Sequence, residues 1–252
     1  MTAQAPKCML KVGNRTVLEW QIDTLLEYGV DAITVVAGYG ADHVQRLLDQ
    51  RYDPNVVHIL YNTLFEVSDN LVSCWFARQE MDEDFILLNG DTLFEIEVMD
   101  RLMDAPRRPI TLATNVKSGY DEDDMKVCLE GSRLVRIGKD IPVDEVDAES
   151  IGMTLFRDAG IERFRSALEQ AMRGPKAYKQ WYLSVIEILA HAGIVWTQCL
   201  RGPQWLEIDD LTDLELARTL VPGWALPDQD IPLIEAAWLP TIESAFEDVK
   251  IL

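Results

Sequence analysis

The chain has 252 residues, of which 48% are hydrophobic and 26% are charged, a balance typical of a globular protein and not of a disordered one. It carries 23 basic and 43 acidic residues, a formal net charge of -20, which repels a phosphate backbone and argues against nucleic acid as a partner. The sequence has no long uncharged apolar run and no signal-peptide-like start. We therefore expect no membrane partner and a cytoplasmic location.

The cysteines and histidines are not spaced as the ligands of a metal site are. The four cysteines are widely spaced without a C-x-x-C pair, and the three histidines lack metal-ligand spacing. We expect the cysteines to be small apolar side chains rather than disulfide or zinc partners.

The first part of the chain alternates helices with short apolar strands. Apolar residues at helical spacing follow Thr16, a candidate cap, and Gly29 marks the predicted helix end. Further helices are predicted at 42–50 and from 68 or 69 to about 80, and strands at 32–37, 56–61 and 85–88. Such alternation indicates parallel strands with helices packed on both faces.

The pattern changes after Pro106. The turn Glu130-Gly131-Ser132 lies between two apolar runs and predicts a hairpin. Strands are predicted at 110–115, 125–129, 134–137, 151–156, 194–199 and 205–208, and helices around 161–168, at 180–191 and at 211–220. We expect one α/β domain over 1–220, with a mixed, mostly parallel sheet and helices on both faces.

Residues 221–252 form a separate extension. Four prolines interrupt a segment that still carries Trp224, Trp238 and Phe246. Because a solvated tail seldom holds so many large apolar groups, we expect it to pack on the domain or on a second subunit of a homodimer.

Two acidic positions are candidates for chemistry. Asp91 follows the buried run Phe85-Ile-Leu-Leu88 across a turn at Gly90, and Asp209 follows Trp205-Leu-Glu-Ile208. Groups at the carboxyl ends of parallel strands open into the ligand crevice, where carboxylates can hold a magnesium ion that bridges phosphate oxygens. Asp91 could instead bond its own turn. Asp210 is the expected cap of the next helix, which leaves Asp209 free to face the crevice.

Several short motifs resemble those of sugar-phosphate nucleotidyltransferases. Pro6-Lys-Cys-Met-Leu-Lys-Val-Gly-Asn-Arg-Thr-Val-Leu-Glu19 is similar to their Pro-Lys stretch. Leu88-Asn-Gly-Asp91 resembles their metal-binding strand end, and Trp205-Leu-Glu-Ile-Asp209 their second metal aspartate. Leu134-Val-Arg-Ile-Gly-Lys139 and Glu149-Ser-Ile-Gly152 resemble the segment that contacts the acceptor phosphate.

The resemblance covers about residues 5–217. Tyr61-Asn62, Asp69-Asn70 and the Glu-Ile-Asp form of the last motif bring the chain nearest to phosphocholine cytidylyltransferase-like proteins. It implies attack of a phosphomonoester on the α-phosphate of a nucleoside triphosphate, such as CTP, with release of pyrophosphate.

The resemblance also implies roles for individual residues. Asp91 and Asp209 are the implied ligands of Mg²⁺, Lys7 the contact to the triphosphate and Lys139 the contact to the acceptor phosphate. Asn70, Glu149 and Gly152 are weaker candidates for base or acceptor contacts, and each has an ordinary structural alternative. An aromatic and acidic pocket would suit a quaternary ammonium acceptor; Trp75, Tyr120, Trp181, Tyr182 and the run 121–124 are the available residues.

One family element is missing from this sequence. Family members carry a buried strand and a glycine-rich loop before the Pro-Lys motif, whereas Pro6 is here preceded by only five residues. Three explanations stay open: the protein is longer, it is a short form that binds without turnover, or another segment such as 221–252 completes the sheet. A glycosyltransferase is the rival enzyme class, but Thr92 and Leu93 follow Asp91 and give no Asp-x-Asp pair.

Overall fold

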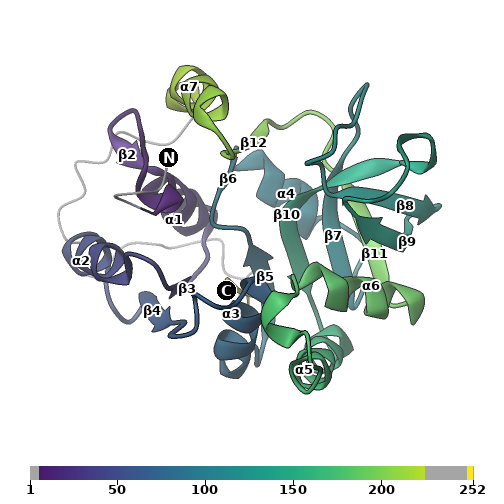
Figure 1. Ribbon diagram of the computed structural model, residues 1–252. Coiled ribbons are helices and arrows are strands. Elements are labelled where there is room, and N and C mark those ends of the chain that lie inside the picture. Colours follow the sequence, from purple (N-terminus) through teal and green to yellow (C-terminus); the bar gives the residue numbers. More distant parts are fainter. Residues whose placement is uncertain (1–5, 225–248, 252) are drawn as a thin grey trace.

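The computed structural model describes residues 6–224 and 249–251, and within them nine strands form one sheet (Figure 1). Its order is β4-β3-β13-β5-β10-β7-β11-β9-β8. The strands are β3 (Ala32–Ala37), β4 (Val57–Tyr61), β5 (Asp84–Leu88), β7 (Ile110–Asn115), β8 (Lys126–Glu130), β9 (Arg133–Gly138), β10 (Ala148–Phe156), β11 (Val195–Cys199) and β13 (Val249–Ile251).

The sheet contains both parallel and antiparallel pairs of strands. Strands β4, β3, β13 and β5 are parallel neighbours, as are β7 and β11. The long strand β10 is antiparallel to both β5 and β7, and β8 and β9 form the predicted antiparallel hairpin. The expectation of a mostly parallel sheet therefore holds for β4-β3-β13-β5. In the rest of the described sheet β7 and β11 are the one parallel pair, because a hairpin, not a crossover helix, precedes β10.

Helices lie on both faces of the sheet (Figure 1). Apolar side chains of α1 (Val17–Tyr28), α2 (Ala41–Arg51) and α4 (Glu97–Met103) enter one buried cluster with one face of the strands. Those of α3 (Asn70–Phe76), α5 (Ala159–Met172) and α6 (Leu183–His191) enter a second cluster on the other face. No helix in the described part of the chain combines the length and apolarity that crossing a membrane requires.

Local signals set several helix ends. Thr16 caps α1 through its side chain and forms a capping box with Glu19, and Gly29 ends the helix in the left-handed region at φ 101°. The helix predicted to reach residue 80 is shorter: α3 ends at Phe76 and a 3₁₀ turn follows. The 3₁₀ turns are Lys7–Met9, Ala77–Gln79, Val143–Glu145, Ala177–Lys179 and Val221–Gly223.

A third, small core joins both ends of the described domain. It is built around Trp20 and Ile208 from the hairpin β1 (Lys11–Val12) and β2 (Arg15–Thr16), the start of α1, and the last helix α7 (Leu211–Leu220). A separate two-stranded sheet, β6 (Thr92–Phe94) with β12 (Trp205–Glu207), enters the same core. This core holds the N-terminal Pro-Lys motif against the segment that carries Asp209.

The C-terminal extension is described at its two ends. Val221 and Trp224 are buried in the third core, while β13 inserts into the middle of the main sheet, parallel to both neighbours. Residues 225–248, on which much of the packing prediction for this extension falls, lie outside the described residues.

Candidate active site

The turn after β5 carries Asp91 and is hydrogen-bonded to helix α1. Gln21 of α1, which is buried, donates from Nε2 to the carbonyl oxygens of Asn89 and Thr92, at 2.8 Å each. The Asn89 amide in turn donates to the Gly152 carbonyl at 2.8 Å. The Asp91 carboxylate is thus placed by a buried amide on one side and a sheet strand on the other.

Asp209 reaches the same place from the other end of the sequence. Strand β12 pairs antiparallel with β6, directly after Asp91, and Ile208 donates its backbone N–H to the Asp91 carbonyl at 3.0 Å. As expected, Asp210 caps α7: its side chain accepts from the amides of Thr212 and Asp213. The Asp209 side chain takes no part in that cap.

Lys7 lies between the two aspartates. Its Nζ is 2.8 Å from Oδ1 of Asp209 and 4.0 Å from Oδ2 of Asp91. Partial burial lowers the pKa of Lys7, but the hydrogen bond and charge of Asp209, with the charge of Asp91, outweigh it and leave the pKa raised. The ammonium therefore stays charged and bridges two carboxylates that sequence alone could not place together.

A third carboxylate, Glu207, belongs to this group and was not among the predicted site residues. Burial raises its pKa to about 7, the charges of Asp91 and Asp209 add to the shift, and the charge of Lys139 acts against it. Burial likewise raises the pKa of Asp91, while Lys7 lowers it. Glu207 and Asp209 alternate in an extended segment and so face the same side, a spacing that could have indicated Glu207.

The donor set fits a hard divalent cation. Asp91 and Asp209 supply carboxylate oxygens, the ligands that Mg²⁺ prefers, and such an ion usually completes its shell with water and substrate phosphate. The Lys7 ammonium lies within ion-pair distance of both carboxylates. The two carboxylates are therefore close enough to share one cation. Among the described residues, no group of three or more acidic, histidine or cysteine side chains is arranged as a metal site.

Lys139 lies on the hairpin that borders this group. Its Nζ is 3.6 Å from Oδ1 of Asp123 and 5.5 Å from the ring centre of Trp181, which is 45% exposed. The buried Lys126 donates from Nζ to the Lys139 carbonyl at 2.8 Å and fixes the backbone there. A half-exposed ammonium beside an exposed aromatic ring can accept an anionic group from solvent.

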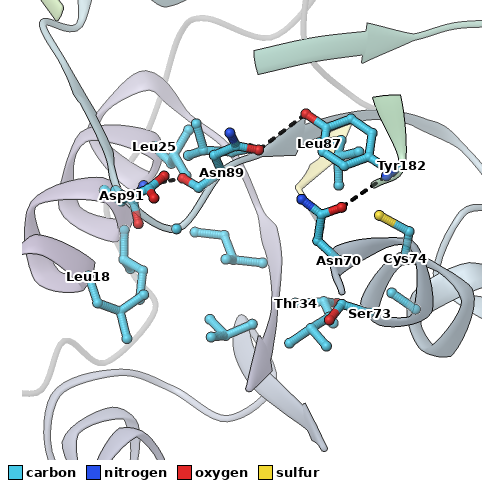
Figure 2. Close-up of a pocket in the computed structure, with 18 residues that line it drawn as sticks. Leu18, Leu25, Thr34, Asn70, Ser73, Cys74, Leu87, Asn89, Asp91 and Tyr182 are labelled. Carbon is cyan, nitrogen blue, oxygen red and sulfur yellow. Dashed lines mark hydrogen bonds between the residues drawn. The ribbon is translucent and has the colours of Figure 1, made fainter. Parts of the chain in front are cut away.

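Asn70 and Gly152 both make structural contacts next to the turn that carries Asp91. Asn70 Oδ1 accepts from the Tyr182 amide at 2.9 Å, and the Tyr182 hydroxyl donates to Asn89 Oδ1 at 3.2 Å (Figure 2). Gly152 has φ +74°, and a Cβ at this position would lie 2.6 Å from Asn89 Nδ2 and 2.9 Å from Thr92 Oγ1. The structure thus gives Gly152 a packing role against the turn, and its contact with substrate stays a prediction.

Glu149 is buried rather than solvated. Its carboxylate is 2.8 Å from Lys117 Nζ and accepts a hydrogen bond from Asn115 Nδ2 at 3.2 Å. Burial raises its pKa, against the effect of Lys117. Lys117 also contacts Asp124, at 2.6 Å, so the acidic run 121–124 is tied to Glu149 through one lysine.

A cavity of about 300 Å³ opens beside Asp91 (Figure 2). Strands β3 and β5 line it on opposite sides, α1 covers it from one face of the sheet and α3 from the other. Asn70, Asn89 and Asp91 are among its polar lining residues.

No family model matches the chain, but sequence comparison finds relatives whose names refer to CMP, CTP or cytidylyl transfer. The chain is 27% identical over 221 residues to CMP-5'-(3-aminopropyl)phosphonate synthase of Streptomyces rubellomurinus, covering 84% of this chain and 35% of that protein. It is 24% identical to CTP:phosphoglutamine cytidylyltransferase of Campylobacter jejuni, covering 86% and 92%. It is 22% identical to choline-phosphate cytidylyltransferase of Streptococcus pneumoniae, covering 84% and 88%. The chain thus spans about a third of the length of the first relative and most of the other two.

Solved structures share the fold. The inositol-1-phosphate CTP transferase of T. maritima matches with a TM-score of 0.72 and 21% identity, over 90% of this chain and 91% of that one. The CTP:phosphocholine cytidylyltransferase of Streptococcus pneumoniae matches with a TM-score of 0.69 and 16% identity, over 86% and 90%.

Proposed function

With its resemblance to the nucleotidyltransferases confirmed, we propose that this chain transfers a nucleotidyl group from a nucleoside triphosphate to a small phosphomonoester and releases pyrophosphate. The observation that carries the proposal is the contact of Lys7 with both Asp91 and Asp209. Two carboxylates and one ammonium from distant segments meet here, and one of the carboxylates, Asp91, also lines the cavity. Such a group suits a reaction in which a polyphosphate must be held and its charge neutralised.

Mg²⁺ is the proposed cofactor, held by Asp91 and Asp209. When bound, it would neutralise the triphosphate and the charge that develops during displacement. With such an ion held by Asp91 and Asp209, the Lys7 ammonium would be available to the triphosphate, a role that a compact point charge suits.

The donor is proposed to be CTP. Three relatives named for cytidine nucleotides support this choice. Asn70 and Asn89 line the cavity, and their side-chain amides are the proposed partners of the base. A cytoplasmic location, where nucleoside triphosphates are available, is part of the same proposal.

The acceptor is proposed to be a small phosphomonoester such as phosphocholine or a sugar 1-phosphate. Lys139 would hold the phosphate, and its neighbour Trp181 offers an aromatic face to a cationic tail. Glu149 is proposed to act indirectly, since its carboxylate binds Lys117, which also contacts Asp124.

The test is magnesium-dependent pyrophosphate release by the 252-residue chain. Four nucleoside triphosphates are crossed with phosphocholine and several sugar phosphates, and Asp91→Asn is the control. We expect release that requires one nucleotide–acceptor pair and is lost in the variant. No release from a folded chain with any pair would contradict the proposal.

A second candidate function is ligand binding without turnover. The cavity beside Asp91 favours it, because part of the site lies open between two strands. Saturable CTP binding without pyrophosphate release would support this alternative over catalysis.

A further inference from the structure

Tyr182 belongs to the main core, but its hydroxyl group reaches the candidate active site. The residue is 2% exposed, and its ring lies in the same buried cluster as Leu87 of β5 and Leu183 of α6. The hydroxyl donates to Asn89 Oδ1 at 3.2 Å, in the turn that follows β5 (Figure 2). A buried tyrosine hydroxyl usually has a hydrogen-bond partner, so the function of this contact depends on what Asn89 holds.

The backbone of Tyr182 is itself fixed by the start of α3. The Tyr182 N–H donates to Asn70 Oδ1 at 2.9 Å (Figure 2). Two backbone hydrogen bonds join the residues on either side of Asn70 to the segment 178–180, at 2.9 and 3.3 Å. The hydroxyl of Tyr182 therefore projects from a segment with a defined position, and it can hold a neighbouring side chain in a defined position too.

Asn89 is the anchor of the turn that carries Asp91. Its backbone N–H donates to the Gly152 carbonyl at 2.8 Å, and its carbonyl accepts from Gln21 Nε2 at 2.8 Å. Both backbone groups of Asn89 thus have partners, and the freedom that remains is rotation of the side chain. The two ends of that side chain differ chemically, because the oxygen accepts hydrogen bonds and the NH₂ group donates them.

The Asn89 side chain joins Tyr182 to the carboxylates of the candidate active site. Burial raises the pKa of Glu207, and a hydrogen bond with the Asn89 side chain acts against this rise. Since an ionised carboxylate can only accept, the NH₂ group of Asn89 serves Glu207 and the oxygen is left for the Tyr182 hydroxyl. Without that hydroxyl the oxygen loses its donor, and the amide is no longer held in one orientation.

We propose that Tyr182 is a positioning residue of the candidate active site: by holding the Asn89 amide, it fixes Glu207 and the turn of Asp91 in the arrangement that receives a divalent cation. This inference rests on the proposed function, in which Asp91 is a ligand of Mg²⁺. Residues that hydrogen-bond to the surroundings of metal ligands commonly change metal affinity or activity by about 10- to 100-fold when they are replaced. Tyr182 acts in this way through Asn89.

The first variant is Tyr182→Phe, which keeps the ring in the core and removes the hydroxyl. Mn²⁺ is the probe, because carboxylate sites that suit Mg²⁺ also suit this ion, and its binding is followed by the relaxation of water protons with and without CTP. We expect the Kd for Mn²⁺ to rise about tenfold, and the melting temperature to fall by about 2–4 °C for one lost buried hydrogen bond. Metal binding needs no turnover, so this result is independent of pyrophosphate release.

Tyr52→Phe is the matched control for a purely structural role. Tyr52 is 8% exposed, lies at the end of α2 and donates from its hydroxyl to Asp23 Oδ1 at 2.9 Å. This variant also loses one buried hydroxyl contact, so its melting temperature should fall at least as far as that of Tyr182→Phe. Its affinity for Mn²⁺ should stay that of the wild type.

A double variant tests whether Tyr182 acts through Asn89. Asn89→Ala removes the amide, and we expect it to weaken Mn²⁺ binding by itself. The double variant Tyr182→Phe/Asn89→Ala should then bind Mn²⁺ within about twofold of Asn89→Ala, because two residues on one route are not additive. A further tenfold loss in the double variant would overturn the route through Asn89.

Kinetics give a readout that general destabilisation does not move. At low Mg²⁺ we expect Tyr182→Phe to release pyrophosphate about tenfold more slowly than the wild type, with the acceptor KM unchanged and the rate restored by excess Mg²⁺. Unchanged Mn²⁺ affinity in Tyr182→Phe, an equal loss in Tyr52→Phe, or no saturable Mn²⁺ binding by the wild type would each overturn the inference. A wild type that binds Mn²⁺ and CTP but releases no pyrophosphate would contradict the proposed function, while the Mn²⁺ comparison would still decide the role of Tyr182.

Discussion

The backbone N–H of Ile208 donates to the carbonyl of Asp91 at 3.0 Å. This bond joins the turn after β5 to the end of β12 and brings Asp91 and Asp209 to either side of Lys7. The candidate active site is therefore built on pairing between β6 and β12, outside the main sheet. Its geometry depends on three segments that are far apart in sequence.

Replacing Asp91 by asparagine is expected to lower kcat/KM for nucleotidyl transfer on the order of 100-fold or more, because a charged ligand of the proposed cation is lost. The melting temperature should not fall, since burial raises the pKa of this carboxyl and its charge opposes folding. Steady-state kinetics and thermal unfolding check both parts. Asp210→Asn, which keeps a good helix cap, is the control and should retain activity; equal loss in both variants would contradict the assignment.

Lys7→Gln is expected to bind Mg²⁺ several-fold more tightly than the wild type in the absence of nucleotide. The ammonium that competes for Asp209 and Asp91 is then gone. The same variant should lose activity, because no charge remains to meet the triphosphate. Calorimetric Mg²⁺ titration tests the first part, with Lys11→Gln, an exposed neighbour, as the control. Weaker Mg²⁺ binding in Lys7→Gln would show that the lysine does not occupy the cation position.

Gly152→Ala is expected to destabilise the fold by about 1–3 kcal/mol. The residue has φ +74°, and the new Cβ would meet the side chains of Asn89 and Thr92. Gly131→Ala is the matched control, since φ there is +66° with nothing within 4 Å of the Cβ, and it should cost less. Urea unfolding measures both; a smaller cost at position 152 would argue against the packing role.

Glu207 gives the protein without divalent ions a pH-dependent stability. Its pKa is raised from an ordinary 4.5 to about 7, so the folded state holds the proton longer than the unfolded state does. The free energy of unfolding should therefore fall as the pH rises from about 4.5 to about 7, by at most about 3 kcal/mol from this group. Glu207→Gln should remove this slope, while Glu215→Gln, on the exposed face of α7, should not. An unchanged slope in Glu207→Gln would contradict the assignment.

The sequence predicted those features that depend on local signals. The Thr16 cap, the Gly29 stop and the Asp210 cap were all identified correctly, because a capping residue acts within one turn of its helix. The strand that ends before Asp91 was equally visible as a short apolar run. The prediction that Asp91 and Asp209 lie at one site came from the resemblance to nucleotidyltransferases, because hydrophobic periodicity says nothing about which distant residues meet.

Features that depend on long-range pairing were not visible. The three residues of β13 carry too little pattern to predict a central strand, and their partners lie more than 160 positions away. The shared contact of Lys7 was not predicted, because it follows from packing in the small third core. Glu207 was missed although its alternation with Asp209 was present in the sequence.

The most direct test of the central claim is transfer of the α-phosphate itself. The chain is incubated with CTP labelled at the α-phosphorus, Mg²⁺ and phosphocholine or a sugar 1-phosphate, and the products are separated and identified by mass. The account predicts that the label appears in a cytidine diphosphate-linked product with one equivalent of unlabelled pyrophosphate, and that Asp91→Asn forms none. Label that stays in CTP with every acceptor, in a chain shown to be folded and to bind CTP, would contradict nucleotidyl transfer.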